Sequence, residues 1–406
     1  MIGHVDADCF YVSAERVRHG KLRGVPVGVL GNHGACIIAK SYEMKAAGVG
    51  TGMPIWDAVP VCPEGVYVKR DFRWYETLSR MMLGIVKELS PRVEFYSIDE
   101  SFFVAREASL DAAARLQQAI LRRVGVPASI GLAPTKTLAK LISDSSKPFG
   151  YGVVATEHER RQLLEGLPVT EITGIAKRSA KKLAAYGITT CDQFAAADRA
   201  LIRRLLTKTG EELWWELNGT PCKPVVIAKP RNQFIARGGS IGRATRDPIR
   251  VEAFVVRNAE RLVEALDHYQ LACEQVTLDL HFSDAPGRAQ RACLHGGHCE
   301  PDVIRQAALW LLEQLWQPRA GSVRYMHVIA GRLTDRSVRQ RGLFDADSGE
   351  IKSPEKLAAV ADVQQLINDR IGRFALRSGS TLPLTDVHAD PANDYDICDI
   401  YGKSCF

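Results

Sequence analysis

Two apolar stretches carry carboxylates where a buried strand is expected. Residues 95–103 hold Asp99 and Glu100 within a run of aromatic, β-branched and small residues. Residues 2–11 hold Asp6 and Asp8 in a similar setting. An ionised carboxylate is very costly to bury unless a cation or hydrogen bonds compensate its charge. The two stretches therefore predict one shared site for a divalent cation.

The elements around these stretches predict an α+β chain with several domains. With 406 residues the chain is too long for a single hydrophobic core. The first 150 residues or so follow a β-α-β-β-α-β order, which predicts a ferredoxin-like sheet with a small glycine-rich module, residues 10–70, inserted after its first strand. Residues 154–219 have a wholly helical pattern, and a second β-α-β-β-α-β set spans residues 234–333.

The composition argues against a membrane protein and against a secreted one. No apolar run approaches the roughly 18 residues that span a bilayer, and the N-terminus lacks a basic segment followed by an apolar one. We therefore expect a cytoplasmic protein with no membrane partner. The ten cysteines are scattered without Cys-x-x-Cys spacing, which favours reduced, mostly buried thiols. Among them, one cluster fits no recognised zinc spacing and is expected to form a loop between strands: Cys293, His295, His298 and Cys299.

Basic residues are concentrated in the middle of the chain. Residues 223–261 contain nine Lys/Arg against three Asp/Glu, whereas residues 336–406 contain nine against eleven. Such a segment indicates a polyanionic partner, in particular nucleic acid, although an ordinary solvated basic face has the same composition.

Residues 172–188 have the pattern of a helix–hairpin–helix. Gly174 would form the tight turn, and its backbone N–H groups would bind a phosphate of DNA. Lys177, Lys181 and Lys182 would add positive charge. An ordinary pair of helices is the alternative interpretation of this segment.

Four segments, taken together and in this order, resemble the motifs of Y-family DNA polymerases, the translesion enzymes: residues 5–11, 39–49, 96–102 and 131–141. The middle motifs are most similar to the UmuC branch, the catalytic-subunit type of bacterial polymerase V. The resemblance covers residues 1 to about 335. It implies a palm (1–9 and 71–153), fingers (10–70), a thumb (154–219), a linker (220–230), a little finger (231–335) and a C-terminal tail (336–406).

The resemblance implies a template-directed, low-fidelity DNA polymerase that performs translesion synthesis during DNA repair and the SOS response. Its chemistry would be two-metal transfer of a nucleotide from a dNTP to a primer 3′-hydroxyl. Two Mg²⁺ ions would be held by carboxylates and one backbone carbonyl: Asp6, Asp99, Glu100 and the carbonyl of Ala7. Asp6 and Asp99 would bridge the ions and Glu100 would face the primer end, whereas Asp8 would be structural. Since neighbouring residues of a regular strand point to opposite faces, the strand must depart from alternation near Glu100.

The resemblance also assigns a nucleotide pocket. Tyr11 would be the steric gate, whose ring leaves no room for a ribose 2′-hydroxyl; without this context it would be interpreted as a core aromatic. The triphosphate contacts would be the backbone amides of Cys9 and Phe10 and the side chains of Tyr42, Lys45 and Lys147. Arginine is common in the wider family where Lys45 stands, and lysine keeps the charge but loses the bidentate fork.

Further partners follow from the second half of the chain. In the little finger, Arg237, Arg243 and Arg246 are the candidates for contacts to primer–template DNA. Residues 340–344 resemble the peptide that binds the sliding clamp, with Gln340, Leu343 and Phe344 as its contact residues and Gly342 where Ser or Asp is usual. Accessory mutagenesis subunits are a further expected partner. The tail is expected to be poorly ordered outside one helix, residues 354–370.

Two other functions remain open at this stage. The first is a catalytically weak, clamp-bound scaffold of a mutagenesis complex, which would need no metal carboxylates. The second is a DNA-binding module without polymerase activity, built on the helix–hairpin–helix, which leaves the N-terminal carboxylates unexplained.

Overall fold

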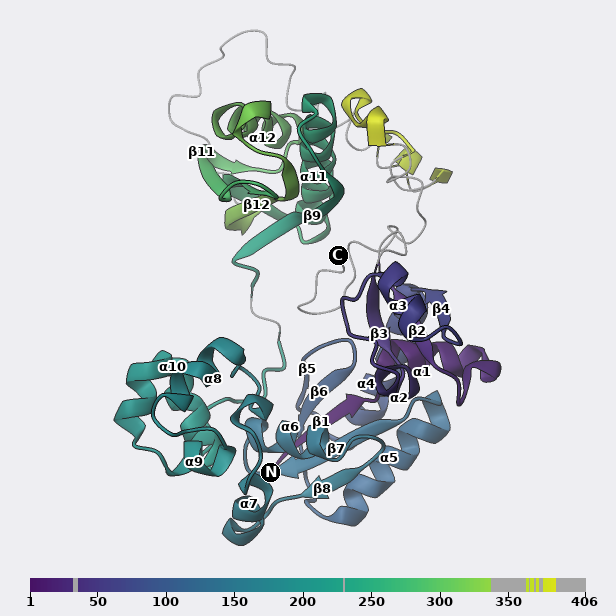
Figure 1. Cartoon of the computed structure of the whole chain (residues 1–406), viewed down its shortest axis with the longest axis vertical. Coiled ribbons are helices and arrows are strands. Elements are labelled where there is room, and N and C mark those ends of the chain that lie inside the picture. The colour runs from purple at the N-terminus through teal and green to yellow at the C-terminus, as the bar shows by residue number, and fades with distance from the viewer. Residues whose placement is uncertain are drawn as a thin grey trace. The chain divides into compact units, whose positions relative to one another are not determined.

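The computed structural model describes residues 1–31, 36–228, 231–336 and 375–384, with short pieces at 363–364, 366–368 and 370–371. The chain divides into two units, and the boundary between residues 229 and 230 lies within the segment expected to be a linker (Figure 1). Within the described residues, no helix is both long and apolar enough to cross a membrane.

The first unit is built on a five-stranded sheet with the N-terminal strand at its centre (Figure 1). Its strands, in spatial order, are β5 (Val93–Phe95), β6 (Glu100–Val104), β1 (Ile2–Ala7), β7 (Ala128–Ala133) and β8 (Tyr151–Val153). All neighbours are antiparallel except β7 and β8, which are parallel. The helices of this part are α4 (Phe72–Leu89), α5 (Leu110–Val124) and α6 (Lys136–Ser145).

Helix α6 lies unusually close to the centre of this sheet. Gly131 of β7 is the register partner of His4. A Cβ atom on Gly131 would lie 2.0 Å from the carbonyl oxygen of Ala139 in α6, so only glycine fits here. The face of β1 that carries His4 and Asp6 is therefore the face that α6 covers.

The stretch 95–103, which the sequence pattern suggests is one strand, is a hairpin. Strand β5 ends at Phe95 and β6 begins at Glu100, and the N–H groups of Tyr96 and Ser97 donate to the Glu100 carbonyl at 3.2 and 3.0 Å. The Ser97 hydroxyl hydrogen-bonds the Asp99 side chain and accepts from its backbone N–H, which competes with strand pairing. The departure from alternation that two adjacent carboxylates require is thus a turn between two strands.

The rest of the first unit comprises a small sheet and a helical region. The small sheet has the order β3 (Ile37–Lys40), β2 (Val27–Leu30) and β4 (Val66–Lys69), with helices α1 (Phe10–Arg18), η1 (Gly20–Leu22), α2 (Tyr42–Ala46) and α3 (Ile55–Val61). The helical region contains α7 (Glu157–Leu164), η3 (Val169–Glu171), α8 (Lys177–Ala184), α9 (Cys191–Ala196) and α10 (Arg199–Leu217). Its apolar residues share a core with α6, since Leu183, Phe194 and Leu213 cluster with Leu138 and Ile142.

The second unit has the predicted β-α-β-β-α-β order and one antiparallel sheet, β11-β10-β12-β9. Its elements are β9 (Phe234–Thr245), α11 (Pro248–His268), β10 (Leu271–Phe282), β11 (Arg288–His298), α12 (Pro301–Leu315), η4 (Pro318–Ala320) and β12 (Val323–Asp335). The expected loop at Cys293–Cys299 is wrong, because β11 continues to His298. There the His298 ring contacts the Glu300 carboxylate at 3.0 Å and the His295 carbonyl at 2.9 Å.

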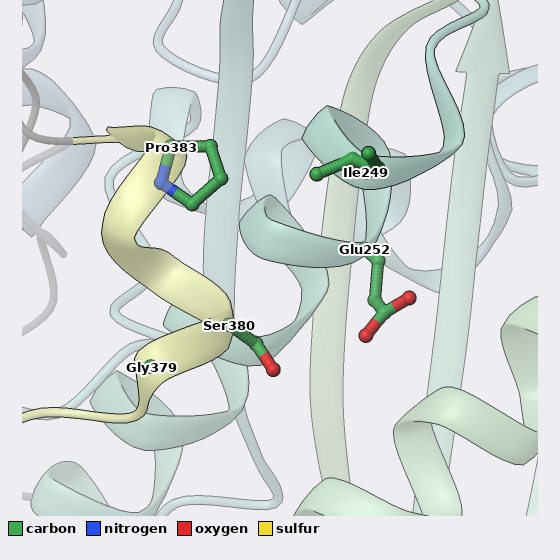
Figure 2. A pocket seen from close by; sticks show the side chains of 5 residues that line it. All are labelled: Ile249, Glu252, Gly379, Ser380 and Pro383. Carbon is green, nitrogen blue, oxygen red and sulfur yellow. The ribbon is translucent and has the colours of Figure 1, made fainter.

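Part of the tail packs on this unit, contrary to the expectation of disorder. Residues 379–384 form a short helix, η5 (Gly379–Leu384), against α11, with Leu384 only 2% exposed. The Ser378 N–H donates to the Glu260 carboxylate at 2.8 Å. A pocket of about 280 Å³ lies between the two helices, lined by Ile249 and Glu252 of α11 and by η5 (Figure 2). The polar composition concealed this anchoring, which includes the buried Thr381 and Leu384 and the hydrogen bond to Glu260.

Two expectations for the tail fall wholly or largely outside the described residues. The clamp-binding residues Gln340, Leu343 and Phe344 lie there entirely. Of the helix expected at residues 354–370, residues 363–364, 366–368 and 370 are described, and they are helical.

Candidate functional site

Asp6 and Glu100 face one another across two adjacent strands. They are register partners in the antiparallel pair β1–β6, so their side chains lie on the same face of the sheet. Asp6 is 5% exposed, and the Glu100 side chain is 12% exposed. His4, two residues before Asp6, lies fully buried on this face with its Nε2 3.3 Å from Glu100 Oε2. Ligand atoms of these three residues all lie within 4.8 Å of one another, close enough to share one ion.

Two lysines compensate the carboxylates. Lys140 of α6 places its Nζ 2.5 Å from Glu100 Oε2 and 3.5 Å from Asp6 Oδ2. Lys147, just after α6, places its Nζ 2.9 Å from Asp6 Oδ2. Asp144 lies between the two, at 3.5 and 3.0 Å from their ammonium groups. The close packing of α6 on the sheet is what brings these cations to the carboxylates.

Burial and charge act differently on the two acids. Burial raises the pKa of Asp6 to about 7, although the charges of Lys147 and Lys140 oppose the shift. Burial also acts to raise the pKa of Glu100, but the hydrogen bond from His4 and the charge of Lys140 outweigh it and lower the pKa to about 2. Burial lowers the pKa of His4, which favours a neutral ring. Glu100 is thus ionised at neutral pH, whereas Asp6 needs a further cation to be fully ionised there.

Asp99 and Ala7 join the site through the backbone. The Ala7 N–H donates to the Asp99 carbonyl at 2.9 Å, which ties the hairpin turn to the end of β1. The Asp99 charge contributes to raising the pKa of Asp6, so the two carboxylates are near neighbours. The Asp99 carboxylate accepts from the Ser97 hydroxyl and is not part of the group of ligand atoms that His4, Asp6 and Glu100 form. The carboxylate oxygens of Asp6, Glu100 and the neighbouring Asp99 are the hard donors that Mg²⁺ prefers.

Asp8 has a different environment from the other acids. Its carboxylate accepts from the Ser129 hydroxyl at 2.9 Å and from the Phe149 N–H at 2.6 Å. Both oxygens are therefore engaged by protein donors, in keeping with the structural role expected for it.

Tyr11 lies in a group of aromatic rings beside the carboxylates. It is the second residue of α1, which starts sharply after β1 because Cys9 adopts the left-handed conformation (φ 44°). The Tyr11 ring stacks on Tyr75 and touches Phe72 and Phe10 edge-on or tilted. Tyr11 is only partly buried.

The expected triphosphate contacts lie on three elements. Phe10 begins α1, and the N–H groups of a first helical turn have no intrahelical acceptor, which suits an anion. Tyr42 begins α2, where burial and the nearby Asp8 and Cys9 raise the pKa of its hydroxyl well above its usual value. Lys45, in the same helix, is exposed. Lys147 pairs with Asp6, as described above.

The expected DNA contacts differ in exposure. In the helical region Gly174 has a positive φ of 103°, as a tight turn requires, and α8 follows with exposed Lys177, Lys181 and Lys182. In the second unit Arg243 and Arg246 are exposed, and Arg246 pairs with Asp284 at 2.6 Å. Arg237 is only 8% exposed and lies on the side of β9 that also carries buried Ile235.

Three residues of the site were not predicted: His4, Lys140 and Asp144. A signal for the last two was present in the sequence. Lys136, Lys140 and Asp144 are spaced four apart, so they lie along one side of a helix. Lys136 occupies the same side one turn earlier, where it pairs with Glu94 at 2.7 Å. His4 had a signal too, since it alternates with Asp6 along the strand.

Comparisons with known proteins agree on one family. The model of the impB/mucB/samB family matches residues 5–144, and that of its C-terminal domain matches residues 233–343. Protein ImpB of Salmonella typhimurium is 33% identical over 386 residues, covering 89% of each chain. DNA polymerase IV 1 of Bacillus subtilis (strain 168) is 28% identical over 395 residues, covering 94% of this chain and 93% of the relative.

Solved structures share the fold at lower identity. A chimera of the Y-family DNA polymerases Dbh and Dpo4 matches with a TM-score of 0.71 at 22% identity, over 82% of this chain and 99% of the chimera. An insertion ternary complex of Dbh DNA polymerase matches with a TM-score of 0.55 at 23% identity, over the same shares. The expected α+β architecture is thereby confirmed.

Proposed function

The chain belongs to the impB/mucB/samB family of Y-family DNA polymerases, and we propose that it extends primers past template lesions by metal-dependent nucleotidyl transfer. It is a DNA-directed DNA polymerase, which takes primer–template DNA and dNTPs as substrates, and its family acts in translesion synthesis and damage-induced mutagenesis. The observation that carries the proposed mechanism is the buried Asp6–Glu100 pair with Asp99 beside it.

The proposed cofactor is Mg²⁺, with two ions in the active site. Asp6, Asp99, Glu100 and the Ala7 carbonyl would hold them, as the hard donor set allows. Bound there, the ions would activate the primer 3′-hydroxyl and neutralise charge on the leaving pyrophosphate. The raised pKa of Asp6 supports this proposal, because a carboxylate with a pKa of about 7 is stabilised by any cation that joins it.

The basic groups around the carboxylates would position the triphosphate. Lys147 and Lys45 supply charge, Tyr42 supplies a hydroxyl, and the first turn of α1 supplies the N–H groups of Cys9 and Phe10. Phosphoryl transfer asks a protein mainly for such positioning and charge neutralisation. When phosphate binds, Lys147 would exchange its contact with Asp6 for one with substrate.

We assign the parts of the fold by the same analogy. The five-stranded sheet would be the palm, the module around β2 the fingers, the helices α7–α10 the thumb, and the second unit the little finger. Gly174 with Lys177, Lys181 and Lys182 in the thumb, and Arg243 and Arg246 in the little finger, would contact DNA phosphates.

A primer-extension assay with Mg²⁺ tests the proposal directly. The wild type should add dNTPs, and Asp99→Ala/Glu100→Ala should abolish addition while leaving DNA binding intact. Glu211→Ala/Glu212→Ala is a matched control, because these adjacent acids pair with Arg203 and Lys208 on α10, away from the site. Extension by the Asp99→Ala/Glu100→Ala variant would refute the assignment. No extension by the wild type would instead favour the clamp-bound scaffold.

The sliding clamp and accessory mutagenesis subunits are proposed as protein partners. Gln340, Leu343 and Phe344 form the clamp peptide in the sequence, and its apolar pair would fill a pocket on the clamp. Leu343→Ala/Phe344→Ala should lose the clamp in a pull-down, with Val363→Ala/Leu366→Ala in the same tail as the control. Retention of the clamp by the first variant would refute the assignment.

A further inference from the structure

The ring of Tyr11 has a partner that neither the sequence pattern nor the proposed mechanism assigns. Tyr75 of α4 lies 4.7 Å from it between ring centroids, with the planes only 16° from parallel. Such a stack fixes the plane of a ring, whereas the edge-on contact from Phe72, at 5.6 Å and 75°, bounds it from the side. Tyr75 and Phe72 therefore fix the orientation of the Tyr11 ring.

Tyr75 is itself firmly held. It is fully buried, and its hydroxyl donates to the Glu15 carboxylate at 2.7 Å. Glu15 lies in α1 four residues after Tyr11, so these two side chains share one side of the same helix. Tyr75 contacts both of them, Tyr11 by stacking and Glu15 by a hydrogen bond. Stacking and hydrogen bond together tie α4 to α1 at two successive turns.

The acceptor is fixed in turn by an ion-pair network. Arg18 donates to both oxygens of Glu15, at 2.9 and 3.0 Å, and to Asp71 at 2.7 Å. Asp71 caps the N-terminus of α4 by accepting from the Trp74 N–H. The contacts form a closed circuit from α1 to α4 and back, which leaves the Tyr75 ring little freedom to turn.

From this circuit we infer that Tyr75 is a positioning residue for sugar selection, which acts by holding the Tyr11 ring where it excludes a ribose 2′-hydroxyl. The inference rests on the proposed role of Tyr11 as the steric gate. A side chain at the start of a helix can turn about its Cα–Cβ bond, and a ring that turns by one rotamer no longer fills the space beside the sugar. A gate therefore needs a backing surface, and Tyr75 provides it.

The test measures discrimination, defined as kcat/KM for a dNTP divided by kcat/KM for the matching rNTP. Tyr75→Met removes the stacking face at similar volume and is expected to lower discrimination by about threefold to tenfold, the range that corresponds to one aromatic pair. Its effect should come from a rise in rNTP use, with dNTP use nearly unchanged. A merely structural role would lower both together, and that outcome would overturn the inference.

Two further variants keep the test decisive. Tyr75→Phe, which changes one hydroxyl, retains the stack and should lower discrimination by no more than about threefold, even if Tyr75→Met folds poorly. Tyr67→Met is the matched control, since Tyr67 is also anchored through its hydroxyl, to the Ala58 and Cys62 carbonyls, and should leave discrimination unchanged. Equal losses in Tyr67→Met and Tyr75→Met would overturn the inference.

A double-mutant cycle separates this inference from the proposed function. If Tyr75 acts through Tyr11, Tyr75→Met should have no effect on discrimination in a Tyr11→Ala background. Tyr11→Ala alone should abolish most discrimination; if it does not, the gate assignment fails and the inference with it. If Tyr11→Ala has its effect but Tyr75→Met does not, only the role of Tyr75 is refuted.

Discussion

The two units bury opposite kinds of side chain beneath a helix. On β1 of the first unit, the face covered by α6 carries His4 and Asp6, with Glu100 opposite. On β10 of the second unit, Val276, Leu278 and Leu280 alternate toward α11 and α12 and are fully buried. Both sheets are antiparallel around these strands and both interiors are closely packed. The chemical nature of the buried face is what differs.

This difference shows that the first unit is less stable than it could be because it buries ionisable side chains at its candidate metal site. Buried charges contribute little net stability even when paired, whereas each buried leucine contributes about 1.5–3 kcal/mol. The first unit keeps its charges because Lys140 and Lys147 compensate them, and because apolar residues of the same face, among them Ile2 and Phe102, join a core shared with α6 and the helical region. In the second unit the β10 face is apolar, and the buried polar residues Arg257, Asn258 and Arg261 lie on α11 instead.

Among variants that keep all the carboxylates, the largest effect is expected from removing one compensating cation. Lys140→Met leaves Glu100 and Asp6 without their shared ammonium group, so the carboxylates repel and move apart. The single-turnover rate of nucleotide addition should fall by roughly 10²–10³-fold, as for other lost charge-stabilising groups. Lys136→Met, one turn earlier on α6 and paired with Glu94, is the matched control and should fall by far less. Similar losses in both variants would show that the charge network is not specific to the site.

The second unit should respond in the opposite way. Leu278→Ala opens a cavity in a fully buried apolar layer and should cost about 2–5 kcal/mol of that unit's stability. Hydrogen exchange resolved by peptide should then show faster exchange across β10 and α11 and unchanged exchange in β1, β6 and α6. Faster exchange in both units would mean that the two units unfold together. The difference between their buried faces would then not translate into separate stabilities.

The contrast also explains which features could be predicted. The carboxylates at Asp6, Asp99 and Glu100 were visible because a charge in an apolar strand is anomalous within a few residues of sequence. The hairpin at residues 96–99 was not, since Ser97 competes with strand pairing through hydrogen bonds that depend on the final geometry. Lys140 and His4 were missed because their partners lie 40 and 96 residues away from them in sequence, both being Glu100. Leu384 was missed because its packing partners belong to the apolar cluster of the second unit, far from it in sequence.

A smaller effect concerns the free-energy cost of burying the ionised Asp6 carboxylate. The pKa of Asp6 in the folded chain, about 7, exceeds its ordinary value, so folding disfavours the ionised form and the metal-free protein loses stability as pH rises from about 4 to 7. Asp6→Asn removes this loss and should raise the free energy of unfolding at pH 8 by about 2 kcal/mol, less than the full shift because Lys147 loses a partner. Thermal melts in a chelator should show a gain that is present at pH 8 and absent at pH 4.5.

Mg²⁺ should reduce the difference in stability between Asp6→Asn and the wild type. An ion that binds the folded wild type stabilises it, and the same ion has fewer ligands in Asp6→Asn. A stability difference that is independent of both pH and Mg²⁺ would contradict the assignment of Asp6 as a metal ligand whose ionised form destabilises the metal-free protein. Burial also raises the pKa of Asp8, although hydrogen bonds from Phe149 and Ser129 oppose the shift, so Asp8→Asn should show a pH-dependent gain of the same sign that Mg²⁺ leaves unchanged.

The smallest effects concern the DNA contacts proposed for each unit. Each lost phosphate contact should reduce the slope of log K against log salt by about 0.9. Lys177→Ala/Lys181→Ala/Lys182→Ala should reduce this slope by up to about 2.7, because all three side chains are exposed on α8. Arg243→Ala/Arg246→Ala should reduce it by nearer 0.9 than 1.8, because Arg246 is already paired with Asp284.

Arg237→Ala is the control that makes this measurement informative. Its side chain is 8% exposed, so its removal should leave the salt slope unchanged and lower the stability of the second unit instead. A reduced slope with unchanged stability would mean that Arg237 reaches the phosphates after all. Burial would then not tell which basic residues of the second unit bind DNA. The comparison between the apolar face of β10 and the charged face of β1 would also lose force, because a buried arginine of the second unit would serve DNA binding.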